Sequence, residues 1–160
     1  MADTTDVLLN LIDKQWSQAK QSEDQRSTLT NYVILVAGGL ESFIVQRSFS
    51  KETLVLAVIL VLLGILGAIA SAKYYERFRL SMHRVGAMMD KLEELHKDAR
   101  IWELQTQADK EHIERFPKLN KIRLHYIWLM LHIGIAVLGV INVLIGEHYV
   151  FFTDGFEVFF

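Results

Sequence analysis

The feature that most constrains the fold is the segment 54–71, LVLAVILVLLGILGAIAS, which contains no charged side chain. An α-helix rises about 1.5 Å per residue, so roughly 20 apolar residues cross a hydrocarbon core of about 30 Å. A chain of 160 residues has little interior in which to bury such a helix away from lipid. The segment therefore predicts a transmembrane helix, which we place at residues 53–72.

Two further segments are long and apolar enough to span a bilayer. Residues 124–146 are uncharged when histidine is neutral, although they include His125, His132 and Asn142. Residues 29–46 carry one charged side chain, Glu41, whose insertion costs on the order of 2.5 kcal/mol or more. We nevertheless predict a span there, because the run YVILVAGGL would otherwise be exposed, and the short stretch that follows suits a tight hairpin into the next span.

Composition favours an all-α membrane protein. Apolar side chains make up 51% of the chain, and one proline and nine glycines leave little material for long linkers. The absence of cysteine excludes disulfides, thiolate metal sites and cysteine nucleophiles. The first 27 residues lack the basic start and apolar centre of a signal peptide, so we expect no cleavage there. The fold class expected is three transmembrane helices with an N-terminal amphipathic helix and a cytoplasmic helical insert.

The distribution of basic residues predicts the topology. Three lie in residues 1–28, two in the hairpin before the second span, twelve in residues 73–123, and none after Gly146. Positively charged loops remain in the cytoplasm. We therefore expect the N-terminus and the 73–123 insert to be cytoplasmic, and the aromatic tail at 147–160 to be extracytoplasmic. Its Asp154-Gly155 dipeptide suits either a small hairpin or an interfacial segment.

The two cytoplasmic parts have helical patterns. In the insert, apolar positions recur at steps of four and three, with a parallel stripe at sevens, which is typical of a coiled-coil seam; they are Phe78, Met82, Val85, Met89, Leu92, His96 and Ala99, beside Tyr74, Ser81, Met88, Leu95 and Trp102. We expect the second span to continue into this stalk. In residues 1–28, the apolar face is formed by Leu8, Leu11, Ile12, Trp16 and Ala19. The stalk's partners are the N-terminal helix, the returning helix or other copies, and we favour an oligomer.

Four polar side chains within the spans are candidate functional residues, because such residues are rare in membranes. Glu41 and Asn142 fall at similar depth, so a hydrogen bond between them is one interpretation; a ring of Glu41 carboxylates in a cation pore is the other. His125 and His132, seven residues apart, either hydrogen-bond to another helix, for example to Asn31, or belong to a proton or ion pathway.

Small residues form stripes in all three spans. Gly64, Ala68 and Ala72 lie along the second span, with Gly67 and Ser71 beside them. Such stripes allow helices to approach closely. We expect Gly134 and Gly139, or the pair Gly38-Gly39, to supply complementary surfaces or flexible points.

Four cations on one side of the stalk are candidate ligands for a cytoplasmic polyanion. Lys73, Arg77, Arg84 and Lys91 follow one another at spacings of four, seven and seven. Repeated in an oligomer, they would concentrate positive potential that attracts phosphate groups. The alternative is a solvated or headgroup-facing surface.

Motifs for catalysis are absent from the sequence. It contains no phosphate-binding loop, dinucleotide fingerprint, His-Glu-x-x-His or Gly-x-Ser-x-Gly pattern. The six histidines lack the spacing of a metal-ligand set. We therefore expect neither an enzyme nor a cofactor or metal.

The layout of two close spans, the basic insert KYYERFRLSMHRVGAMMDKLEEL and a closing span resembles the small multi-pass membrane effectors of bacterial antiphage operons. These include SLATT-type proteins and the channel-forming HalA of the Hailong system. The resemblance implies a homotetrameric inner-membrane ion channel that depolarises infected cells. It further implies a single-stranded DNA oligomer as gating ligand, made by a companion nucleotidyltransferase. The alternative function is a non-conducting membrane scaffold that recruits a cytoplasmic partner through the stalk.

Overall fold

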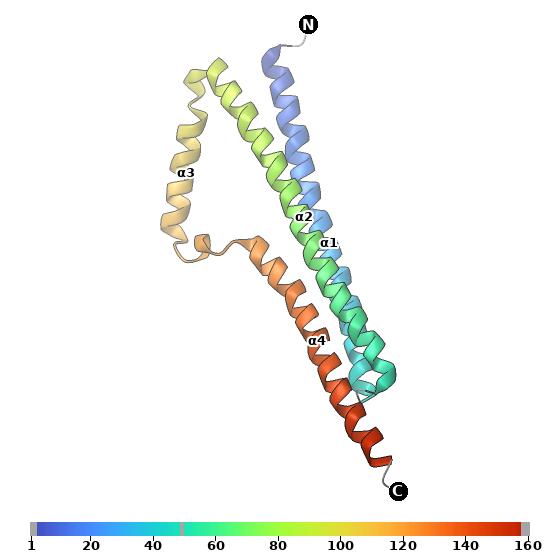
Figure 1. Cartoon of the computed structure of the whole chain (residues 1–160). Coiled ribbons are helices and arrows are strands. Elements are labelled where there is room, and N and C mark those ends of the chain that lie inside the picture. The colour runs from blue at the N-terminus through green and yellow to red at the C-terminus, as the bar shows by residue number, and fades with distance from the viewer. Residues whose placement is uncertain (1–2, 49, 158–160) are drawn as a thin grey trace. The chain divides into compact units, whose positions relative to one another are not determined.

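The computed structural model describes residues 3–48 and 50–157, and every regular element in them is a helix (Figure 1). The long helices are α1 (Thr4–Gln46), α2 (Lys51–Leu95), α3 (Ile101–Arg115) and α4 (Leu124–Glu157). Two short 3₁₀ turns, η1 (Lys97–Ala99) and η2 (Leu119–Lys121), stand on either side of α3. Helices α1, α2 and α4 are each long and apolar enough to cross a membrane.

The expected N-terminal helix and first span are a single helix, α1. Residues 4–37 contain no proline or glycine, so nothing in the sequence interrupts backbone hydrogen bonding between the two segments. In the same way α2 runs through the second span and ends only at Leu95. The stalk seam predicted on one helix therefore ends early, since His96 is not helical and Ala99 belongs to η1.

The hairpin considered for the C-terminal tail is wrong within the described residues. The backbone of α4 stays helical through Asp154 and Gly155 as far as Glu157. The remaining residues of the predicted tail, 158–160, lie outside the described residues.

The chain divides into two compact units. The stalk unit contains the described residues up to Gln25 and Lys73–Tyr126. The span unit contains Arg26–Ala72 and the part of α4 from Ile127 onward. Helices α1, α2 and α4 each contribute to both units.

Buried positions in the span unit repeat at steps of three, four or seven residues. On α2 they are Thr53, Ala57, Leu60, Gly64, Gly67 and Ser71, and on α1 they are Arg26, Thr30, Val33, Ala37 and Ile44. On α4 they are His132, Gly139, Asn142 and Gly146. This spacing is that of helices packed side by side at a small crossing angle. Many of the buried residues are small or polar, as expected where lipid supplies no hydrophobic drive for helix association.

Three glycines allow α2 and α4 to approach closely. A Cβ on Gly64 would lie 2.4 Å from the backbone nitrogen of Ala136, and one on Gly139 would lie 2.7 Å from that of Val61. A Cβ on Gly67 would meet His132 Nδ1 at 2.4 Å. The predicted stripe therefore faces α4 through Gly64 and Gly67, Ser71 is buried, and Ala72 is exposed. A Cβ added at Gly38, Gly39 or Gly134 would meet no atom within 4 Å.

The stalk unit is built around a seam between α1 and α2. Its buried residues are Ala19 and Ser22 of α1 with Ser81 and Val85 of α2. The side of α2 that faces this seam combines residues from both predicted stripes. Phe78, Val85 and Leu92 come from the first stripe, and Tyr74, Ser81 and Met88 come from the second; those that are not buried are half-buried. On α1 the expected apolar face is rotated, since Leu11 and Trp16 are exposed and Gln15 is half-buried.

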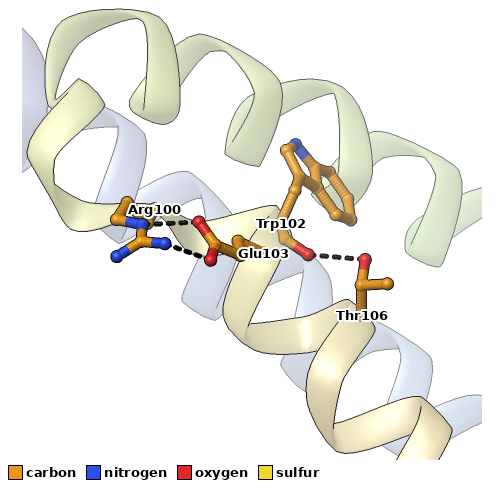
Figure 2. A network of polar contacts seen from close by, with 4 residues as sticks. All are labelled: Arg100, Trp102, Glu103 and Thr106. Atoms are coloured by element: carbon orange, nitrogen blue, oxygen red, sulfur yellow. Dashed lines mark hydrogen bonds and ion pairs between the residues drawn. The ribbon is translucent and has the colours of Figure 1, made fainter.

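Helix α3 returns alongside α2 through a left-handed residue, Arg100, with φ 49° and ψ 44°. Figure 2 shows its guanidinium joined to the Glu103 carboxylate and the Trp102 carbonyl accepting a hydrogen bond from the Thr106 hydroxyl at 2.7 Å. The Trp102 amide also donates to Glu93 Oε2 at 3.1 Å. No described residue of α3 is buried, so at its first turn the hydrogen bond from Trp102 to Glu93, and not a core, attaches it to α2.

We expect Gly64→Ala to destabilise the span unit by about 1–3 kcal/mol, the usual cost of overpacking a close contact. The added methyl meets backbone of α4, which can move only by separating the helices. Titration with a denaturing detergent, followed by circular dichroism, measures the change. Gly134→Ala is the matched control, because its methyl enters open space; equal effects of the two substitutions would contradict the packing described here.

Candidate functional site

The four polar residues singled out in the spans fall into three different environments. Glu41 and Asn142 are joined, because Asn142 Nδ2 donates a hydrogen bond to Glu41 Oε2 at 2.6 Å. Asn142 is 4% exposed and Glu41 is half-buried. The first interpretation of this pair is therefore confirmed as a contact within one chain, whereas the carboxylate ring stays a prediction.

His132 is fully buried and bonds to Thr30, not to Asn31. The two atoms, His132 Nε2 and Thr30 Oγ1, are 3.1 Å apart. The Thr30 hydroxyl donates its one proton to the Arg26 carbonyl at 2.9 Å. It must therefore accept the hydrogen bond from His132, which places a proton on Nε2. Asn31 is wrong as the partner because it is exposed, on the opposite side of α1 from the buried seam.

The second ring nitrogen of His132 has an unusual environment. Nδ1 is buried and has no hydrogen-bond partner among the described residues. It faces the α2 backbone at Gly67, where any larger residue would collide with the ring. His132 thus lies where α1, α2 and α4 meet, and both Thr30 and Gly67 are needed to hold it.

His125 belongs to the stalk unit, where its ring stacks on Tyr75 and makes a tilted contact with Tyr126. Its ring lies 4.1 Å from that of Tyr75, at an interplanar angle of 9°, and 3.9 Å from that of Tyr126. A cation–π contact occurs nearby in sequence within the span unit, where the Arg26 guanidinium lies 5.6 Å from the centre of the Trp128 ring. Arg26 is 2% exposed.

The exposed faces of the three span helices differ in character. On α2 they carry aliphatic residues from Val55 to Ile69, and on α4 they carry residues such as Ile127, Leu131 and Leu144. The face of α1 opposite its buried seam instead carries Asn31, Leu35, Gly38 and Ser42, at steps of four, three and four, with Gly39 and Gln46 beside them. Lipid favours apolar side chains on all of its contact surface. This face, the outer face of α1, is therefore better suited to water or to another protein helix.

A polar pocket of about 380 Å³ lies between α1 and α2 in the stalk unit. Its lining consists of Gln18, Gln21, Ser22 and Gln25 from α1 and Arg77, Leu80, Ser81 and Arg84 from α2. Two guanidinium groups and three amides can donate hydrogen bonds to phosphate oxygens, and the amides can also accept them from a base or sugar. This set of residues suits an anion that also carries polar groups.

The pocket includes two of the four predicted cations, Arg77 and Arg84. The other two are engaged along their own helix, because Lys73 pairs with Glu76 and Lys91 pairs with Glu94. The hydrogen bond from Lys91, together with its charge, lowers the pKa of the Glu94 carboxyl below its usual range. Lys73 and Lys91 are not among the residues that line the pocket.

Sequence reasoning missed the α1 side of this pocket. Gln18, Gln21, Ser22 and Gln25 recur at helical spacing, which was a usable signal of a continuous polar face. The apolar residues of the same segment predict a different contact face, but Trp16, one of these residues, is exposed.

Comparison with protein families, curated proteins and solved structures finds no match to this chain. Among the described residues, no group of three or more histidine, aspartate or glutamate side chains is placed to hold a metal ion. The candidate sites therefore rest on the geometry of the polar pairs, the outer face of α1 and the pocket.

Asn142→Leu should destabilise the protein, because it leaves the Glu41 carboxyl in the span unit without its amide donor. In Glu41→Leu/Asn142→Leu the polar group is removed together with its partner, so part of the loss should be recovered. A double-mutant cycle in detergent should give a coupling energy on the order of 1–2 kcal/mol. Additive effects of the two single substitutions would show that the contact contributes nothing to stability.

Proposed function

We propose that this protein is an oligomeric ion channel of a bacterial inner membrane, with α1 lining the conducting pathway. The observation that carries the proposal is the outer face of α1, where Asn31, Gly38 and Ser42 lie beside the exposed Leu35, whereas the exposed faces of α2 and α4 are mainly aliphatic. If several copies associate through their spans, these faces meet around a common axis. Small and hydroxyl-bearing side chains there leave room for water and ions.

Glu41 has a supporting role in this arrangement. Its hydrogen bond to Asn142 ties α1 to α4, which fixes the rotation of α1 and hence the direction of its outer face. The hydrogen bond between Thr30 and His132 also joins α1 to α4, nearer the other end of the span. In the proposed channel both pairs are structural, and they keep the aliphatic faces of α2 and α4 toward lipid.

The resemblance to antiphage effectors supplies the biological setting of the proposal. A homotetramer with cytoplasmic N-termini would depolarise the cell when it opens, and the basic stalk pocket would bind its gating ligand. Arg77 and Arg84, with the glutamines of α1, suit a nucleotide or a single-stranded DNA oligomer. A companion nucleotidyltransferase would be the source of such a ligand.

The pocket offers a physical route for gating. Its two walls belong to α1 and α2, and each of these helices continues without a break into the span unit. A polyanion that bridges Arg77 and Arg84 would change the separation or rotation of the two helices. Because helices transmit such movements along their axes, the outer face of α1 would move with them.

The channel itself is tested by expressing the protein alone in bacteria and recording membrane potential with a voltage-sensitive dye, followed by conductance of the purified protein in planar bilayers. We expect depolarisation and discrete conductance. Gly39→Leu, which places a bulky side chain beside the outer face of α1, should reduce conductance at least severalfold. Gly134→Leu on the exposed face of α4 is the matched control and should leave conductance unchanged, since both glycines adjoin open space.

The outcome that contradicts the proposal is a silent, correctly assembled protein at all voltages and with ligand present. A scaffold is then the better function, and α3 is the surface that favours it. No described residue of α3 is fully buried, and Leu104 and Ile113 are exposed on it. Specific capture of one soluble protein, lost on Leu104→Glu, would support the scaffold.

The ligand site is tested by binding of single-stranded DNA oligomers to the detergent-purified protein. Arg77→Glu/Arg84→Glu should abolish binding without affecting assembly, whereas Arg79→Glu, an arginine of the same helix outside the pocket lining, should bind as wild type. Affinity should fall steeply with salt, because neutralised phosphates release their counterions. If Arg77→Glu/Arg84→Glu bound the oligomers as tightly as wild type and Arg79→Glu, the pocket would not be the ligand site.

A further inference from the structure

The segment 116–123, FPKLNKIR, is a short connection between α3 and α4 whose exposed side chains are of two kinds, apolar and basic. Its apolar side chains, Phe116, Leu119 and Ile122, are 40%, 64% and 58% exposed. They recur every third residue, and Lys118 and Lys121 recur at the same spacing. The turn η2 covers only Leu119–Lys121, so the two sets alternate along a short and mostly irregular stretch of chain.

The rest of the chain does not neutralise these charges. No acidic residue lies between Glu114 and Glu147. Within the described residues, Lys118, Lys121 and Arg123 take part in no ion pair. Exposed apolar side chains are unfavourable in water, and the three cations beside them attract negative charge. Together they suit a surface that is both anionic and apolar.

The position of the segment in the chain identifies that surface. Helix α4, the third helix that is long and apolar enough to cross a membrane, begins at Leu124, the residue that follows the segment. Tyr126 and Trp128 occupy the first turns of α4, and such residues concentrate at the membrane–water boundary. The 116–123 segment is therefore held at the boundary by its covalent connection to the span.

We propose that residues 116–123 form an interfacial anchor that binds anionic phospholipids. Phe116, Leu119 and Ile122 enter the upper acyl region, while Lys118, Lys121 and Arg123 contact the phosphate groups of the lipids. An anionic surface attracts each such cation by roughly fivefold in affinity at ordinary ionic strength. The anchor fixes the point at which α3 is connected to the membrane. It depends on the chain being a membrane protein and not on its being a channel.

The chain contains no cysteine, so a spin label can be placed at one chosen position without further changes. We would label Leu119→Cys, Ile122→Cys and, as control, Asn120→Cys, an exposed polar position in the same η2 turn as Leu119. Each full-length protein is reconstituted into vesicles of phosphatidylcholine alone or with phosphatidylglycerol. Relative accessibility to oxygen and to a water-soluble nickel complex then reports the depth of each label.

The anchor predicts that labels at 119 and 122 favour oxygen in the anionic vesicles, while the label at 120 favours nickel. Lys118→Glu/Lys121→Glu/Arg123→Glu should abolish the oxygen preference. Labels at 119 and 122 that remain as nickel-accessible as the one at 120 would overturn the proposal, as would equal depth in both lipid mixtures. If inorganic phosphate added to phosphatidylcholine vesicles reproduced the effect, the segment would be a site for free anions and not for lipid.

Discussion

Inside a bilayer a polar group must find its partner within the protein, and this constraint governs how the span unit is assembled. Glu41, Thr30, His132 and Asn142 would each oppose insertion if they faced lipid alone. They are paired across helices instead, Glu41 with Asn142 and Thr30 with His132. Both pairs join α1 to α4, so they set the depth and rotation of the two helices against each other.

Those pairs are possible only because the backbones approach closely. Gly64, Gly67 and Gly139 remove the side chains that would keep α2 and α4 apart, and Gly67 provides the space for the His132 ring. Close packing and polar pairing are therefore interdependent: the glycines bring the helices together, and the polar pairs select one register among the many that small residues allow. The outer face of α1 is left outside this arrangement, and its polar character is the feature that an oligomer would use.

The proposed ligand site and the proposed conducting pathway are built from the same helices. Helices α1 and α2 supply both walls of the basic pocket and two of the three candidate spans. An unbroken backbone is a simple means of coupling a binding event to a pathway, because it needs no intervening joint. The anchor proposed at residues 116–123 would add a separate requirement, since it would confine the start of α4 to the lipid surface while α1 and α2 responded to a ligand in the pocket.

The sequence by itself determined the helical class and the three candidate spans, since the length of an uncharged run and the scarcity of proline depend on no distant contact. It also singled out Glu41, Asn142, Arg77 and Arg84, because charge and polarity in unusual places are visible locally. Tertiary structure decided the partners: Thr30 in place of Asn31 for His132, the glutamines of α1 opposite the two arginines, and ion pairs that occupy Lys73 and Lys91. The physical reason is that helical periodicity fixes which residues share a face, whereas the rotation of one helix against another, which brings two faces together, depends on packing summed over the whole contact.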